Sequence, residues 1–276
     1  MNYHGCPIIG GHYTFQTSEW SEGATYEVYL QGSYGNDTNI RGSSDVDIVM
    51  QLTSVFWNNL SQDDKAKLGL TTVPYSLNDF KREVISALQS CYGNDLVDTT
   101  GSKSVKVLAS GNRLKADIVV CATYKYFENL KTRAEGITFW TSYGAQIINY
   151  PKLHRDNGTR KNTSSRTAGS YKPGIRVFKN ARDRIIDQDS GLDGRFPSYF
   201  VECLLYNVPD SKFAGTSQDM YVEVVNWLND RFNDDACGKY VCQNEMQYLF
   251  GPEPVQWNQA DAIELVTRLI ALWNNR

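Results

Sequence analysis

Two aspartates lie two residues apart in a stretch that alternates like a β-strand. In residues 45–52 (DVDIVMQL) the apolar side chains share one face, and Asp45 and Asp47 share the other. Carboxylates about 6.5 to 7 Å apart on one strand repel each other unless a cation compensates them. Mg²⁺ prefers carboxylate and phosphate oxygens. The pair therefore indicates a divalent-metal site, although an isolated Asp-x-Asp is more often a solvated strand face or a turn.

A third aspartate stands in an apolar strand. Residues 114–122 (LKADIVVCA) alternate, and Asp117 is placed where a lone charge is costly unless it is paired or bound to a ligand. Asp117 can complete a two-metal site with the first two aspartates. We predict Asp45, Asp47 and Asp117 as catalytic residues and as ligands of two Mg²⁺ ions, for which Mn²⁺ could substitute.

A glycine and a serine precede the aspartates. The strand expected over 25–31 ends immediately before Gly32 and Ser33. Glycine allows a ligand to approach the backbone closely, and backbone N–H groups beside a serine hydroxyl suit a phosphate. A Gly-Ser pair alone is usually just a turn. Together with the aspartates, it predicts a triphosphate bound beside the metals.

The composition becomes basic after Pro151. Residues 152–184 contain ten Lys or Arg against two acids. Within them Lys172 precedes a proline suited to the first turn of a helix, so Lys172 lies at a helix N-terminus, where anions are favoured. We predict Lys172 as a triphosphate ligand. Lys179, two turns further on, could reach the same phosphates or be a solvated surface lysine.

Two residues near these lysines could contact a base. Tyr171 could stack on one, and the Asn162 amide could read a base edge by paired hydrogen bonds.

The remaining pattern predicts both strands and helices. Gly111 and Asn112 separate two strands with the turn chemistry of a hairpin. Residues 1–24 show no regular period. Strands are expected over 25–31, 45–52, 104–110, 114–122, 136–142 and 145–151, and helices over 76–92, 173–188, 197–206, 217–232 and 258–274.

Composition excludes several classes of protein. The chain has 276 residues and a net charge of -3, which argues against a protein that coats long nucleic acid. It has no apolar run long enough to span a membrane. Six cysteines occur without a CxxC pair, so we expect reduced thiols in a cytoplasmic protein. We also expect a monomer.

The string GSYGNDTNIRGSSDVDIV, with ADIVV later in the chain, resembles the active-site signature of the DNA polymerase beta-like nucleotidyltransferases. Among these, the chain resembles the bacterial CD-NTases, relatives of cyclic GMP-AMP synthase and oligoadenylate synthase. The resemblance continues through GITFWTS, NYPKLHRDNGTRKN, SYKPGIRVFKNARD and PSYFVECLLYNVP. It implies an α+β fold with a mixed-sheet catalytic lobe over 1–151, a mainly helical nucleotide-binding lobe over 152–276, and an active site in the cleft between them.

The same resemblance implies a function. It makes Gly32 and Ser33 the phosphate-contacting pair, and Asp45, Asp47 and Asp117 the carboxylates that bind two metals. The implied reaction makes a cyclic di- or trinucleotide from ribonucleoside triphosphates, ATP with UTP or GTP, and releases pyrophosphate. In bacterial anti-phage (CBASS-type) signalling such a product activates an effector. An asparagine in the KN segment, here Asn162, is associated with pyrimidine acceptance.

Two other classes of function stay open. The same fold can transfer a nucleotide to a tRNA end, a small molecule or a protein, although the acidic net charge weakens the tRNA version. A non-catalytic nucleotide-binding module is the other, and the retention of all three carboxylates argues against it. CD-NTases usually open with a long helix, and residues 1–24 do not read as one.

Overall fold

The computed structural model describes residues 24–40, 45–72, 74–233, 237–253 and 255–275. The expectation for the N-terminal stretch therefore lies outside the described residues, apart from residue 24. The chain divides into two units. The first comprises residues 1–31 and 45–151, and the second comprises residues 32–44 and 152–276. The segment 32–44, which the sequence analysis assigned to the first lobe, thus belongs with the second unit.

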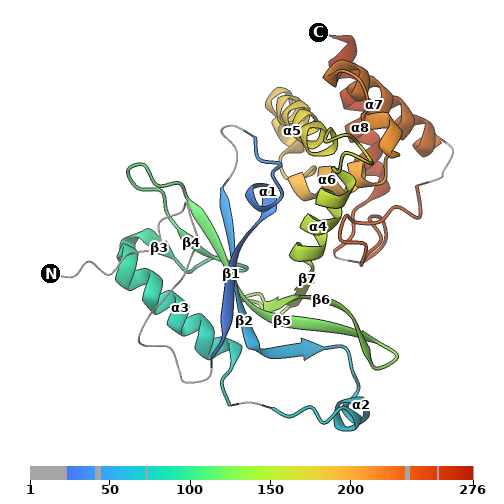
Figure 1. Cartoon of the computed structure of the whole chain (residues 1–276). Helices are drawn as coiled ribbons and strands as arrows, with labels where there is room; N and C mark the ends of the chain where they lie inside the picture. The colour runs from blue at the N-terminus through green and yellow to red at the C-terminus, as the bar shows by residue number, and fades with distance from the viewer. Residues whose placement is uncertain (1–23, 41–44, 73, 234–236, 254, 276) are drawn as a thin grey trace. The chain divides into compact units, whose positions relative to one another are not determined.

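A mixed sheet forms the centre of the first unit (Figure 1). The strand order is β1-β2-β5-β4-β3, with β6 paired to β5 and β7 paired to β6. Only β2 and β5 pair in parallel among these neighbours. The strands are β1 (Tyr26–Gln31), β2 (Val46–Asn58), β3 (Val97–Asp98), β4 (Val105–Val107), β5 (Ala116–Glu128), β6 (Lys131–Trp140) and β7 (Gln146–Asn149).

Helix α3 (Leu77–Tyr92) packs against β5. Its N-terminus carries a capping box in which the Ser76 hydroxyl accepts from the Asp79 N–H and the Asp79 carboxylate accepts from the Ser76 N–H. Gly93, with φ 88°, ends the helix. The helix expected over 76–92 is therefore confirmed. The short helix α2 (Gln62–Lys67) was not anticipated.

The predicted turn at Gly111 joins β4 and β5 as an antiparallel pair. Gly111 has φ 57°, and Ser110 and Arg113 exchange backbone hydrogen bonds of 3.3 and 3.0 Å. The hairpin is confirmed, and it fixes the register of both strands. Its consequence for the site is that Lys106 of β4 lies opposite Asp117 of β5.

The second unit is helical. Its core joins aromatic and aliphatic side chains from several helices, with the Phe178 ring stacked on Tyr221 at 5.0 Å between centroids. Four of the helices were expected from periodicity. The helices are α1 (Gly32–Gly35), α4 (Pro151–Lys161), α5 (Tyr171–Gln188), α6 (Ser198–Tyr206), α7 (Ser217–Asn233) and α8 (Gln259–Asn274).

Helix α4 escaped the sequence analysis for a physical reason. The buried residues of α4 include no large apolar side chain; they are His154, Asn157, Gly158 and Lys161. A search for apolar residues at helical spacing cannot find such a helix. Its buried polar groups bond to other parts of the unit, as Asn157 does by donating to the Gln243 carbonyl at 2.8 Å.

Most of the cysteines in the described part of the chain are free thiols. Cys121, Cys203, Cys237 and Cys242 are free and buried, as expected. Cys91 is disulfide-bonded, so the expectation of a reduced thiol is wrong at that position. None of the helices described combines the length and the hydrophobicity required of a membrane span.

Candidate active site

The parallel pairing of β2 and β5 places two of the predicted aspartates side by side. Asp47 and Asp117 are register partners, so their side chains leave the same face of the sheet. On either side of them, Gln31 of β1 is paired with Asp47 and Lys106 of β4 is paired with Asp117. A row of polar side chains therefore crosses one face of the sheet over four strands.

Asp45, the remaining predicted aspartate, lies two residues before Asp47 and opposite Lys115. The Val46 N–H donates to the Lys115 carbonyl at 3.1 Å, which aligns the starts of the two strands. The Lys115 ammonium donates to Asp45 Oδ2 at 2.6 Å and lies 3.9 Å from Asp117 Oδ1. We refer to Asp45, Asp47 and Asp117 as the carboxylate cluster.

The charges of all three aspartates act on Lys115. Its hydrogen bond to Asp45 is the main cause of a raised pKa, and the negative charges of Asp117, Asp45 and Asp47 add to that effect, while burial opposes it. Lys115 therefore stays protonated at neutral pH and compensates part of the negative charge. The strand alternation, read two residues back from Asp117, could have identified Lys115, but the sequence analysis did not use it.

The donor chemistry of the carboxylate cluster fits a divalent cation. The Asp117 side chain is 25% exposed and that of Asp45 is 50% exposed, so both are open to solvent. Asp117 Oδ1 is nevertheless a buried atom with no hydrogen-bond partner, an arrangement that favours a cation ligand. Among the described residues, no three acids, histidines or cysteines are arranged as a complete metal-binding group, and Asp45 is paired with Lys115 instead.

The face that carries the carboxylate cluster is not polar along its whole length. Val49 and Cys121 follow the aspartates on the same face and are completely buried with Ile137 in a small hydrophobic cluster. The central strands are buried on both faces in their middle parts, over residues 49–52 of β2 and 120–124 of β5. The carboxylates therefore lie where a buried part of the sheet meets solvent.

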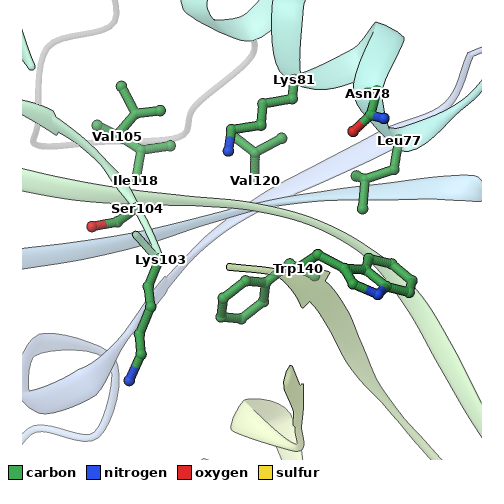
Figure 2. Close-up of a pocket in the computed structure, with 10 residues that line it drawn as sticks. Leu77, Asn78, Lys81, Lys103, Ser104, Val105, Ile118, Val120 and Trp140 are labelled. Atoms are coloured by element: carbon green, nitrogen blue, oxygen red, sulfur yellow. The ribbon is translucent and has the colours of Figure 1, made fainter. Parts of the chain in front are cut away.

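The opposite face of the sheet holds a pocket, shown in Figure 2. Ile118 and Val120 alternate with Asp117 along β5 and line this pocket together with Leu77 and Lys81 of α3. Its cavity volume is about 50 Å³. Ligand sites for molecules of nucleotide size are several times larger, roughly 300 Å³ and above. This pocket is therefore too small for the nucleotide that the sequence predicts.

In the second unit, Gly32 and Ser33 open a tight turn. Gly32 has φ 60°, which a residue with a Cβ adopts only at a cost, so glycine is required for the chain to turn here. The Asn36 N–H donates to the Gly32 carbonyl at 3.0 Å, and the Thr38 N–H donates to the Ser33 carbonyl at 2.9 Å. We refer to residues 32–38 as the serine turn.

Helix α5 holds the serine turn with three basic side chains. Lys172 donates to Asp37 Oδ2 at 3.0 Å, and Arg176 donates to the Asp37 carbonyl at 2.6 Å. Lys179 donates to the Thr38 carbonyl at 2.9 Å. The spacing of four and then three residues puts these cations on one face of the helix. Part of the basic character of residues 152–184 therefore serves to fix this turn.

A buried carboxylate lies beneath the same turn. Glu202 of α6 is 3% exposed and accepts from Thr38 Oγ1 at 2.6 Å and Asn36 Nδ2 at 3.2 Å. His154 Nε2 lies 2.8 Å and the Lys179 ammonium 3.4 Å from the carboxylate. We call these five residues the Glu202 network. Sequence analysis missed Glu202, although an acid inside the apolar stretch YFVECLLY is a signal for a buried, bonded charge.

The Glu202 network keeps its central carboxylate ionised. Burial raises the pKa of Glu202, but the hydrogen bond and charge of His154, the charge of Lys179 and the Thr38 hydrogen bond outweigh it, so the pKa is lowered. Burial is in turn the main cause that lowers the pKa of Lys179, and Glu202 opposes it. The two charges are thus mutually dependent.

Three of the predicted ligand-binding side chains are engaged within the second unit. The Tyr171 ring is completely buried and its hydroxyl donates to Gln243 Oε1 at 2.6 Å, so it cannot stack on a base without leaving the core. Lys179 is buried, which makes the surface alternative wrong and leaves its ammonium bound to protein groups. Asn162 Oδ1 accepts from the Lys172 N–H at 2.9 Å and so bonds to the start of α5. None of these burials can be read from local sequence.

Comparison with known proteins gives both a family and close relatives. The family model for the cGAS/DncV-like nucleotidyltransferase C-terminal helical domain matches residues 156–274. The cyclic UMP-AMP synthase of Rhodothermus marinus is 46% identical, covering 92% of this chain and 86% of its own length. The cyclic nucleotide synthase CdnE01 of Staphylococcus haemolyticus is 39% identical, covering 90% of this chain and 85% of its own length.

Solved structures agree with these relationships. The Rhodothermus marinus CdnE c-UMP-AMP synthase, solved with Apcpp and Upnpp, has a TM-score of 0.84 and 45% identity over 93% of this chain and 86% of its own. The CdnE cyclic dinucleotide synthase of Elizabethkingia meningoseptica, solved with GTP and Apcpp, has a TM-score of 0.73 and 29% identity over 94% of this chain and 86% of its own. The resemblance and the α+β fold inferred from the sequence are confirmed. The chain belongs to the cGAS/DncV-like nucleotidyltransferases, the CD-NTases.

Proposed function

We propose that this chain joins two ribonucleoside triphosphates into a cyclic dinucleotide and releases pyrophosphate as each bond forms. The observation that carries the proposal is the carboxylate cluster, in which Asp47 and Asp117 are register partners on parallel strands and Asp45 lies one step before them. Family membership supports the reaction class, and several of the relatives are described as synthases of cyclic dinucleotides. We therefore favour a dinucleotide over a trinucleotide.

Asp45, Asp47 and Asp117 are proposed to hold two divalent cations, Mg²⁺ or Mn²⁺. Such ions, when bound, would lower the pKa of an acceptor hydroxyl and offset the charge of the triphosphate. The carboxylates supply hard oxygen ligands, and the unpartnered Oδ1 atom of Asp117 supports this role. The adjoining hydrophobic cluster keeps water away from one side of these carboxylates, which strengthens their attraction for a cation.

The serine turn is proposed to bind the phosphates of the same nucleotide. Gln31 is the register partner of Asp47, and Ser33 is two residues after Gln31 in the chain. This proximity in sequence supports one nucleotide that contacts both the serine turn and the metals. We assign the phosphate contacts to Gly32, Ser33 and Lys172. The Lys172 side chain is only 11% exposed, but that of its partner Asp37 is 76% exposed, so water can solvate the Asp37 carboxylate when a phosphate takes its place.

The engaged side chains are proposed to support the turn rather than to touch the nucleotide. Lys179 holds the Thr38 carbonyl, Asn162 holds the Lys172 N–H, and Tyr171 packs in the core below. We propose ATP and UTP as substrates, because a relative at 46% identity is described as a cyclic UMP-AMP synthase. GTP is the second choice, since another relative is described as a dipurine synthase.

The biological setting follows from the family resemblance. We place the enzyme in the bacterial cytoplasm as a monomer, where its product would activate a partner effector in anti-phage defence. The reaction itself can be tested directly. Purified protein is incubated with Mg²⁺ and pairs of labelled triphosphates, and the products are resolved after phosphatase treatment. A phosphatase-resistant cyclic product is expected, and a labelled macromolecule or no product at all would reject the proposal.

The carboxylate assignment is tested by the double variant Asp45→Asn with Asp47→Asn. We expect product formation to fall below detection while the melting temperature is retained, because the carboxylates are part-exposed and do not hold the fold together. The matched control replaces two exposed acids of the same unit, Asp63→Asn with Asp95→Asn, and changes the net charge equally. Undiminished synthesis by the first variant would refute the assignment.

A further inference from the structure

The carboxylate cluster already contains a cation that the chain supplies. Lys115 immediately precedes β5 and stands two residues before Asp117, so it shares the face of Asp117. Its ammonium lies 2.6 Å from Asp45 Oδ2 and 3.9 Å from Asp117 Oδ1. The ammonium therefore lies within 4 Å of two carboxylates of the cluster.

The Lys115 ammonium leaves Asp117 incompletely bonded. Asp117 Oδ1 lies 3.9 Å from the ammonium and has no hydrogen-bond partner. A divalent cation would compensate the cluster better, but it needs Asp45, whose Oδ2 atom is bound to Lys115. Two cations cannot share this position without strong repulsion. Metal binding therefore requires the Lys115 ammonium to leave Asp45.

We propose that Lys115 is a built-in competitor for the catalytic metal, which keeps the carboxylate cluster compensated until a triphosphate arrives. The inference rests on the proposed function. A triphosphate brings several negative charges, which attract the metal and offer the displaced ammonium another partner. Because coupling between two ligands is reciprocal, metal then strengthens nucleotide binding as much as nucleotide strengthens metal binding. Lys115 thereby limits metal binding in the absence of substrate.

The test measures metal binding without nucleotide, so it does not depend on turnover. Mn²⁺ is titrated into the full-length protein and the free ion is followed by electron paramagnetic resonance. Lys115→Met is expected to bind Mn²⁺ about tenfold more tightly than the wild type, because a like charge beside the ion is removed. Lys115→Arg keeps the charge and is expected to bind about as weakly as the wild type. Adding a nonhydrolysable ATP analogue is expected to increase Mn²⁺ affinity strongly in the wild type and much less in Lys115→Met.

Lys131→Met is the matched control. Lys131 is exposed and is the register partner of Glu128, at the other end of β5 from Asp117. Its removal changes the net charge equally, and we expect a change in Mn²⁺ affinity of less than about threefold, since it lies far from the carboxylate cluster. Circular dichroism and melting curves establish that each variant is folded.

Two results would overturn the proposal. One is a Lys115→Met variant that binds Mn²⁺ no more tightly than the wild type, and the other is an equal gain in Lys131→Met, which would indicate a general effect of net charge. Failure of the proposed function is distinguishable, because it would appear as absence of cyclic product from the wild type, whatever the Mn²⁺ affinities of the variants.

Discussion

The carboxylate cluster and the Glu202 network both bring acids and bases together, but they differ in burial and in hydrogen bonding. Asp45 and Asp117 are partly exposed, and the Asp117 Oδ1 atom lacks a hydrogen bond. Glu202 is buried and accepts from four neighbouring side chains. An incompletely compensated, exposed cluster can exchange its partners for a ligand, whereas a buried and fully bonded carboxylate fixes the chain around it. The comparison predicts that ligand binding and positioning of the chain are divided between these two regions.

The largest effect that this comparison predicts is loss of turnover at the carboxylate cluster without loss of stability. Asp117→Asn removes one of the proposed metal ligands, and we expect the rate of cyclic product formation to fall about 10³-fold or more. The melting temperature should change little, because Asp117 Oδ1 has no hydrogen-bond partner and lies 3.9 Å from the Lys115 ammonium, too far for a hydrogen bond. Initial rates of pyrophosphate release and a thermal melt measure both quantities. Asp95→Asn serves as the control, and a variant that retains a tenth of the rate would contradict the assignment.

The opposite outcome is expected at Glu202. Glu202→Ala leaves the buried Lys179 ammonium without its counter-charge, and we expect the free energy of unfolding to fall by about 3 to 5 kcal/mol. Urea denaturation followed by fluorescence measures the loss. Glu135→Ala, at an exposed position of β6, is the control and should change stability by less than about 0.5 kcal/mol. Equal stability of the two variants would remove the distinction between the two regions.

The same carboxylate predicts a pH dependence. The pKa of Glu202 is lowered in the folded protein, so its ionised form contributes stability at pH values above the usual Glu pKa of about 4.3. That contribution is lost as the pH falls through the lowered pKa. The stability difference between the wild type and Glu202→Gln should therefore be constant near neutral pH and shrink in acid. A difference that grows below pH 4 would contradict the lowered pKa.

The sequence allowed more to be predicted about the carboxylate cluster than about the Glu202 network. Strand alternation is local, so Asp45 and Asp47 could be placed on one face from eight residues, and the same rule places Lys115 on the face of Asp117. The Glu202 network joins residues separated by more than 160 positions. Such a set is fixed by tertiary packing, which local patterns do not contain. Tyr171 and Lys179 show this limit, because their residue types suit a ligand while their burial depends on the whole unit.

A substitution in α4 tests how closely side chains pack around His154 of the Glu202 network. Gly158 of α4 leaves room for the Gln243 side chain, which donates to the His154 carbonyl at 2.7 Å and accepts from the Tyr171 hydroxyl. A Cβ at position 158 would meet Gln243 Nε2 at 2.4 Å. We expect Gly158→Ala to lower the free energy of unfolding by about 1 to 3 kcal/mol, measured by urea denaturation. Gly238→Ala, whose Cβ would meet no atom within 4 Å, should be neutral. A neutral Gly158→Ala would mean that the network is loosely packed.

The smallest effect on stability is expected at Lys172, which combines features of both regions. The Lys172 side chain is largely buried, but its loss leaves only the Asp37 carboxylate unpaired, and that side chain is 76% exposed and solvated by water, so we expect a loss of about 1 kcal/mol. Lys172→Met should therefore melt almost as the wild type does and yet raise the KM for the triphosphates about tenfold, as expected when one charge-assisted phosphate contact is lost. Lys212→Met removes an exposed pair with Glu223 in the same unit and controls for charge. An unchanged KM would assign Lys172, like Lys179, to holding the turn alone, and the phosphate contacts would then rest on Gly32 and Ser33.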